Sequence, residues 1–201
     1  MLDKIIFSFD DSNPLNYRLM DLMEKYNFVK NTIFYIDIGN ADLKQLVDLN
    51  MRGFKIGNHT FTHLILQNIK PKRIIQEIEY ANNTIKNLQG EYPTEFCWPR
   101  GRYDDISKKI IGKYFKEART TKVFNYKKPE DPLETNTTIH FSYPRSEYNG
   151  IGWIKLAKEY FIKAKEEKDG RFELWGHAEE CNRFNEWNNL ETFLKWINNN
   201  L

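Results

Sequence analysis

The chain alternates between short apolar runs and longer amphipathic segments almost from end to end. Runs typical of β-strands lie at 4–9, 31–38, 54–58, 95–98, 118–124, 138–143 and 171–177. Apolar residues recur at helical spacing in the segments 15–26, 42–51, 71–88, 104–115, 150–168 and 186–199. Strands interleaved with helices predict a parallel α/β sheet, because parallel neighbours need a helix-length connection.

The length of the chain narrows the choice among parallel folds. We expect its 201 residues to form a single domain, 1–201, long enough for a sizeable core. A full eight-fold barrel usually needs ~250 residues. A smaller or irregular barrel therefore fits better than an open doubly wound sheet, although periodicity alone does not separate the two.

Polar side chains follow several of the predicted strands at the point where each strand ends. Asp10 and Asp11 end the first run, His59 follows the third, Pro99 to Gly101 follow the fourth, and His177 ends the seventh. In a parallel barrel the catalytic residues gather at the carboxyl ends of the strands. The sequence thus places its polar motifs where such a fold would build a site.

Two of these motifs suggest a metal centre. His59 and His63 are four residues apart, which on a helix would place both imidazoles on one face. With one carboxylate from Asp10–Asp11 they would supply three protein ligands and an open position, as catalytic zinc sites do. The alternatives are a capping role for the aspartates and hydrogen-bonded, partly buried histidines.

The later motifs are less specific. Trp98 begins a Trp-Pro-Arg-Gly stretch whose composition is typical of a turn. Alternatively, this stretch is the wall of a substrate groove, with Trp98 as its apolar face. His177 is a general acid only if the metal motifs are real, and Glu179 or Glu180 would then orient it. The remaining isolated groups, His140, Arg119 and Arg145, are interpreted as structural or salt-bridged residues.

Composition excludes several classes of function. Lysine and arginine total 30 against 28 acidic residues, a net charge of +2, which gives no electrostatic basis for binding nucleic acid. The two cysteines, Cys97 and Cys181, match neither a zinc knuckle nor a disulfide framework. No signal peptide and no apolar stretch of ~20 residues is visible, so we expect no membrane span and a cytoplasmic location.

The ordered motifs S-F-D-D, N-H-T-F-T-H, F-C-W-P-R-G and L-W-G-H resemble the polysaccharide deacetylase family, the NodB-homology domain of carbohydrate esterase family 4. The similarity spans nearly the whole chain. It implies a distorted (β/α)7 barrel and a divalent metal, zinc first, with cobalt, nickel or manganese as alternatives. By the resemblance, the metal ligands are Asp11, His59 and His63, the base is Asp10 and the acid is His177.

The resemblance also implies how an acetyl group would be removed. Asp10 takes a proton from the attacking water, a backbone N–H near Tyr103 helps to hold the oxyanion, and His177 protonates the departing amine. Leu174 matches the family's apolar residue beside the acetyl methyl. The expected substrate-binding residues are Trp98, Pro99, Gly101, Tyr103, Leu174 and Trp175.

Two departures from the family pattern concern the supporting residues. The third motif often carries an arginine two residues before its proline, where this chain has Cys97. The fourth motif, an aspartate with a nearby tryptophan, has no clear match between Thr120 and Gly152. Arg119 or Arg145 is the candidate replacement for one of these groups, with Glu180 as a further supporting residue.

The predicted function is therefore metal-dependent removal of acetyl groups from N-acetylated sugars or polysaccharides. A second possibility keeps the chemistry on another substrate, such as a cyclic amide, a formamide or an O-acetyl sugar. A third is an inactive barrel that binds glycans through Trp98 and Trp175. Retention of both Asp10 and His177 beside the ligands favours an enzyme, since a binding module needs neither an acid nor a base.

Overall fold

The computed structural model describes residues 4–201, in which seven strands form one parallel sheet. The strand order is β5-β4-β3-β2-β1-β7-β6. The strands are β1 (Ile5–Asp10), β2 (Thr32–Ile36), β3 (Lys55–Asn58), β4 (Glu95–Cys97), β5 (Glu117–Arg119), β6 (Ile139–His140) and β7 (Phe172–Gly176). Every pairing between them is parallel, as the alternation of strands and helices predicts.

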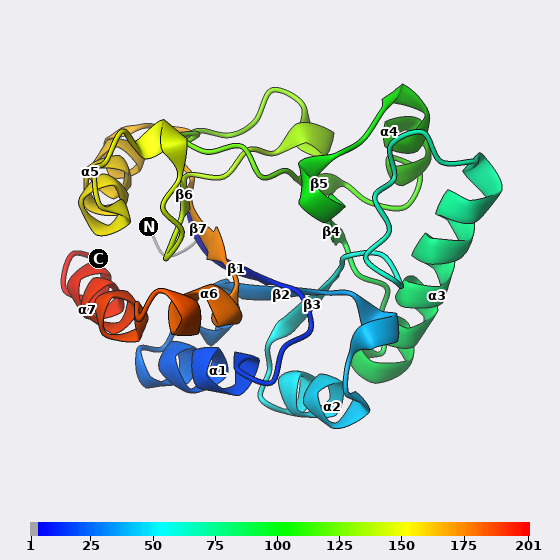
Figure 1. Ribbon diagram of the computed structural model, residues 1–201, viewed down its shortest axis with the longest axis horizontal. Helices are drawn as coiled ribbons and strands as arrows, with labels where there is room; N and C mark the ends of the chain where they lie inside the picture. The colour runs from blue at the N-terminus through cyan, green and yellow to red at the C-terminus, as the bar shows by residue number, and fades with distance from the viewer. Residues whose placement is uncertain (1–3) are drawn as a thin grey trace.

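The helices lie around the outside of this curved sheet (Figure 1). The α-helices are α1 (Asn16–Lys25), α2 (Leu43–Met51), α3 (Pro71–Gln89), α4 (Asp105–Ile111), α5 (Trp153–Glu166), α6 (Ala178–Arg183) and α7 (Trp187–Asn198). Short 3-10 turns are η2 (Val29–Asn31), η3 (Ile38–Asn40), η4 (Pro99–Gly101), η5 (Pro132–Glu134) and η6 (Ser146–Tyr148). Within residues 4–201, no helix is long and apolar enough to cross a membrane.

The segment 120–138 bridges the gap between the two edge strands, β5 and β6 (Figure 1). The Thr135 amide donates to the Ala118 carbonyl at 2.9 Å, and the Thr138 amide donates to the Glu173 carbonyl at 3.0 Å. The sheet therefore curls into the expected distorted (β/α)7 barrel rather than an open doubly wound sheet. The fifth strand is shorter than the predicted run 118–124, because residues 120–124 pair with residues 135–138 of the same bridging segment.

The two faces of the sheet differ in polarity, and strand register explains which side chains share a face. Phe7 pairs with Leu174 in register, and both are fully buried in the main apolar cluster with residues of the outer helices. The alternate positions point inward, where Ser8 contacts Glu173 and lies beside Trp175. The barrel interior is thus polar at positions where a barrel core is ordinarily apolar.

Several helix ends follow the local chemistry of the sequence. Asp42 caps α2 by accepting from the Lys44 amide at 3.0 Å, and Asp104 forms a capping box with Ser107. Pro71 occupies the first turn of α3, where its missing N–H has no cost, and Gly90 ends the helix in the left-handed conformation. The short helix α6 was not predicted, because six residues carry too little periodicity.

Candidate metal centre and active site

Three of the predicted ligands meet at the carboxyl ends of β1 and β3. Asp11 directly follows β1, and His59 directly follows β3. The Asp11 Oδ1 atom lies 3.5 Å from Nε2 of His59 and 3.4 Å from Nε2 of His63. One ligand atom from each residue falls within 4.8 Å of the others, a spacing that can hold one metal ion.

The two histidines approach each other through a loop and not from one face of a helix. Thr60 and His63 have φ angles of 65° and 58°, in the left-handed region that ends regular helix. The Asn58 side chain accepts from the Thr60 amide at 2.7 Å. Such local side-chain bonds compete with helix formation, and here they fold the motif back on itself.

A buried glutamate holds this loop from the side of α3. Glu77 accepts from the backbone amides of Phe61 and Thr62 at 3.0 and 2.8 Å, and from the Thr62 hydroxyl at 3.0 Å. Its side chain is 1% exposed and also pairs with Arg73 at 2.5 Å. No sequence signal singles out Glu77, because it occupies an ordinary helical position 14 residues after His63.

The three residues fit a divalent metal. Nδ1 of His59 lies 2.8 Å from the Cys97 carbonyl oxygen, so this nitrogen donates and Nε2 keeps its lone pair toward Asp11. Burial lowers the pKa of His59, against the effect of Asp10 and Asp11, which favours the neutral imidazole that metals bind. Oδ1 of Asp11 is buried without a hydrogen-bond partner, so its lone pairs are free to bind a cation.

Asp10, the predicted base, points into the barrel beside this cluster. It is 3% exposed and forms an ion pair with Arg119, which is fully buried. Burial by itself raises the pKa of Asp10, but the guanidinium of Arg119 and the nearby His59 and His177 outweigh it and hold the pKa below its ordinary value. Asp10 is therefore held as a carboxylate.

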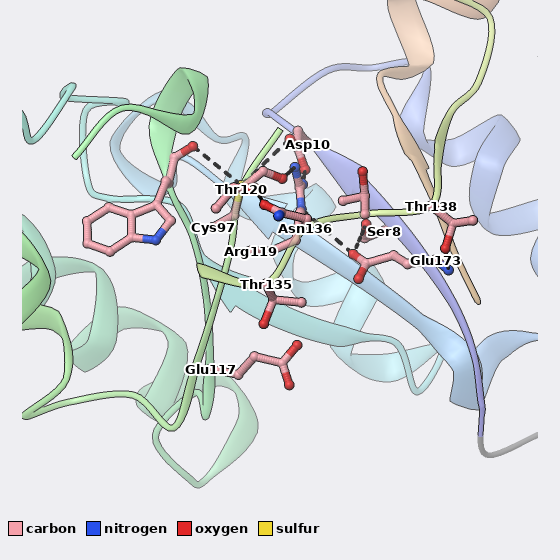
Figure 2. A network of polar contacts seen from close by, with 12 residues as sticks. Ser8, Asp10, Cys97, Glu117, Arg119, Thr120, Thr135, Asn136, Thr138 and Glu173 are labelled. Atoms are coloured by element: carbon pink, nitrogen blue, oxygen red, sulfur yellow. Dashed lines mark hydrogen bonds and ion pairs between the residues drawn. The ribbon is translucent and has the colours of Figure 1, made fainter. Parts of the chain in front are cut away.

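Arg119 belongs to a chain of alternating charges along the inner face of the barrel (Figure 2). Its Nε atom lies 3.8 Å from Oε1 of Glu173, whose other oxygen lies 3.1 Å from Arg171. Arg171 also pairs with Glu117, and Ser8 donates to Glu173 at 2.8 Å. Glu173 was missed as a supporting residue, although a lone acid inside the apolar seventh run was a visible signal.

Arg119 occupies the place expected of the missing third-motif arginine. Cys97 on β4 and Arg119 on β5 are register partners, so their side chains lie on the same inner face. The Cys97 thiol is 3.7 Å from Oδ2 of Asp10, and burial raises its pKa well above the ordinary value. The small neutral thiol leaves the space that the guanidinium from the next strand fills.

His177, the predicted acid, lies on the other side of Asp11. Its Nε2 atom is 3.7 Å from Oδ2 of Asp11, and its Nδ1 atom is 2.9 Å from Oε2 of Glu180. Burial lowers the pKa of His177, but Glu180 and Asp10 outweigh this and raise it to about 9. Of the two glutamates that follow His177, only Glu180 contacts its ring. Burial raises the pKa of Glu180, but His140 and His177 outweigh this and lower it to about 2.

Arg145 does not reach Asp10 or His177. It pairs with Glu147 at 2.7 Å, and its NH1 atom lies 3.4 Å from Nδ1 of His140. The Glu180 carboxylate, rather than either arginine, faces His177 where the family's fourth-motif aspartate is missing. It comes from α6, the helix that was not predicted.

Several expected substrate-binding residues do not offer an open surface. Trp98 is fully buried, donates to the Leu133 carbonyl at 2.9 Å and packs on Tyr103 at 4.8 Å, so it is no exposed groove wall. Leu174 is in register with Phe7, and its side chain faces the outer helices. The next residue, Trp175, therefore points into the barrel interior and is 3% exposed. Pro99 is also buried, whereas Gly101 and Tyr103 are half-buried.

The sequence comparison gives a consistent result. The family model described as polysaccharide deacetylase matches residues 3–115. A Bacillus subtilis (strain 168) protein described as polysaccharide deacetylase YxkH is 28% identical over 115 residues, which are 54% of this chain and 41% of the relative. The chain spans less than half the length of the curated relatives it matches.

Solved structures share the fold at low sequence identity. The Xyl-CE4 domain of a xylanase from the hindgut metagenome of Trinervitermes trinervoides gives a TM-score of 0.64 at 15% identity, covering 98% of this chain and 83% of that one. The Streptococcus pyogenes deacetylase PplD, solved with acetate, gives 0.60 at 21% identity, covering 66% and 62%. With the family model matching more than half of its length, this chain belongs to the polysaccharide deacetylase family.

Proposed function

We propose that this chain is a metal-dependent deacetylase that hydrolyses the N-acetyl groups of amino sugars in saccharides and releases acetate. The observation that carries the proposal is the placement of two ionisable groups on either side of one ligand cluster. Asp10 is held as a carboxylate by Arg119, and His177 presents Nε2 to Asp11 at 3.7 Å. A base and an acid flanking an open cation site is the arrangement that amide hydrolysis needs.

Asp11, His59 and His63 would hold the metal. Two imidazole nitrogens and one carboxylate oxygen form a ligand set suited to zinc, and three protein ligands leave a position for substrate or water. When bound, a divalent cation there would polarise an amide carbonyl and lower the pKa of water. We propose zinc as the native metal on the basis of this ligand chemistry.

Asp10 and His177 divide the proton transfers between them. The Asp10 carboxylate lies close enough to the ligand cluster to accept a proton from an attacking water. His177 keeps a proton on Nδ1 through Glu180, and its Nε2–H then donates to the nitrogen that departs. An amine leaves poorly as an anion, so this second proton transfer is required for an amide.

The protonation state of His177 favours an N-acetyl substrate over an O-acetyl ester. Glu180 accepts from Nδ1 of His177 at 2.9 Å, and this carboxylate favours the protonated ring. An alkoxide leaving group depends less on such an acid than an amine does. The glycan-binding alternative loses its support, because Trp98 and Trp175 are 0% and 3% exposed.

The test is a screen for acetate release with purified, zinc-loaded protein. The substrates are N-acetylglucosamine oligomers, O-acetylated xylan, and small cyclic amides and formamides. We expect the chito-oligomers to be hydrolysed, and Asp10→Asn and His59→Ala to abolish that activity. Glu179→Gln serves as the matched control, because Glu179 is exposed and adjacent to the site residues in sequence. Full activity in Asp10→Asn, or hydrolysis of esters or cyclic amides alone, would reject the proposal.

A further inference from the structure

His140 is a second buried histidine beside His177 that the proposed chemistry does not use. It ends β6 and is 5% exposed. Its ring stacks on Trp175 at 3.9 Å between centroids and on Tyr143 at 5.3 Å, so its plane is held from both sides. The centroid of the His177 ring is 5.8 Å away.

The partners of the two ring nitrogens define the protonation state of His140. Nδ1 lies 3.4 Å from NH1 of Arg145, and arginine can only donate, so Nδ1 must be the bare acceptor. Nε2 therefore carries the proton and donates to Oε2 of Glu180 at 2.8 Å. Burial lowers the pKa of His140, against the effect of Glu180, in agreement with a neutral ring.

Glu180 receives several donors on the same oxygen. Oε2 accepts from Nε2 of His140 at 2.8 Å, from Nδ1 of His177 at 2.9 Å and from the His177 amide at 3.3 Å. A carboxylate bound by one histidine could rotate about its side-chain torsions. Bound by both histidines, it has one orientation, and that orientation faces Nδ1 of His177.

We propose that His140 is a positioning residue for His177, acting through Glu180. Arg145 orients His140, and His140 orients Glu180. Glu180 in turn holds the ring of His177 so that Nδ1 keeps its proton while Nε2–H faces the metal cluster. No proton moves along the series, and Glu180 stays ionised throughout. This inference rests on the proposed function, because it assigns the support of that function's acid.

A second metal ion between His140, His177 and Glu180 is the competing interpretation, since their ligand atoms also lie close together. The contacts argue against it. Separations of 2.8 and 2.9 Å between nitrogen and Oε2 are hydrogen-bond lengths. The guanidinium of Arg145 lies on the remaining nitrogen of His140 and would repel a further cation.

Three variants separate the hydrogen bond from the packing. His140→Phe keeps a ring on Trp175 but removes the donor to Glu180, whereas His140→Gln keeps an N–H donor and removes the ring. Tyr143→Leu removes the other face of the stack and leaves the polar contacts. We expect His140→Phe to lower kcat by about 10- to 100-fold with KM unchanged, as losses of an orienting partner do. His140→Gln should recover most of kcat, and Tyr143→Leu should change it little.

Nuclear magnetic resonance of the zinc-loaded protein tests the same proposal without activity. The chain has four histidines, so long-range ¹H–¹⁵N spectra of the imidazoles are simple to assign. We expect a neutral Nε2–H ring for His140, Nδ1–H on His177, and a mixture of states for His177 in His140→Phe. An Nδ1–H ring for His140, an unaltered His177 spectrum in His140→Phe, or two zinc ions per chain would overturn the proposal. A wild-type protein inactive on every acetylated substrate would reject the proposed function instead, while these spectra would still decide the role of His140.

Discussion

Replacing Arg119 with methionine tests whether charge holds the inner face of the barrel together. Arg119 is fully buried and lies between Asp10 and Glu173 (Figure 2). Methionine has a similar length and fills much of the same space, but it has no charge. The Arg119→Met variant therefore leaves two buried carboxylates without the cation that separates them.

The expected loss of stability follows from the burial of these groups. Removing one partner of a buried ion pair costs about 3–5 kcal/mol, because the remaining charge stays desolvated. Arg171 still neutralises Glu173 at 3.1 Å, so the loss concerns mainly Asp10 and should not exceed this range. For a chain of this size, each kcal/mol shifts Tm by roughly 2–4 °C, which predicts a fall of about 6–20 °C.

Thermal unfolding of metal-free protein, followed by circular dichroism, measures this loss without a contribution from metal binding. The double variant Arg119→Met/Asp10→Asn removes the stranded carboxylate together with its cation and should be more stable than Arg119→Met alone. Arg183→Met is the control, since Arg183 has a side chain 61% exposed and a distant partner at 3.6 Å. If Arg119→Met lies within 1 °C of the wild type, or if the added Asp10→Asn lowers Tm further, charge pairing does not hold the inner face.

Three further predictions concern the metal, the acid and the buried tryptophan. His59→Ala should lose bound zinc in metal analysis, and chelation should abolish wild-type activity until zinc or cobalt is added; turnover after complete metal removal would contradict this. The pKa of His177, raised to about 9, exceeds its unfolded value of about 6.5, so its protonation stabilises the fold fully below about pH 6.5 and this contribution is lost as pH rises through 9. Glu180→Gln should flatten that decline in urea unfolding measured from pH 6 to 10, and an unchanged slope would show that Glu180 does not raise the pKa. Trp98→Ala should lower the free energy of unfolding in urea by about 3–5 kcal/mol and leave KM unchanged. A raised KM at unchanged stability would instead show that Trp98 contacts the substrate.

The fold could be predicted because its signal lies in local periodicity. The longer strands are nearly continuous buried runs, and each long helix buries one face, so both patterns are visible within a short stretch of the sequence. The exceptions have local causes as well. The loop from His59 to His63 has helical spacing, but Asn58 and Glu77 hold its amides and bend it away from a helix. Leu43 and Ile106 are apolar residues of the predicted helices 42–51 and 104–115, yet they are 65% and 57% exposed near the starts of these helices.

The meeting of the candidate ligands could also be predicted, since the carboxyl ends of parallel strands meet at one edge. Asp11 and His59 are examples, because each directly follows a strand. Which side chain faces the substrate side was harder to predict. Leu174 and Trp175 are neighbours, and only the register of β7 against β1 shows that the leucine faces the helices. Strand parity cannot be fixed from an apolar run whose two faces are both buried.

The supporting residues could not be predicted from position along the chain, because a charge can reach the same atom from different elements. Asp10 needs a cation beside it, and adjacent parallel strands place residues in register side by side. Arg119 on β5 therefore supplies the positive charge beside Asp10 that an arginine at position 97 on β4 would supply. In the same way, a glutamate three residues into the turn after His177 supplies the carboxylate that a separate motif would have carried. Both departures from the family pattern preserve the charge that Asp10 and His177, the proposed base and acid, each face. They change only the element that carries this charge. The two gaps in the motifs are thus no argument against the proposed chemistry, since the electrostatic partner of each group is present in space.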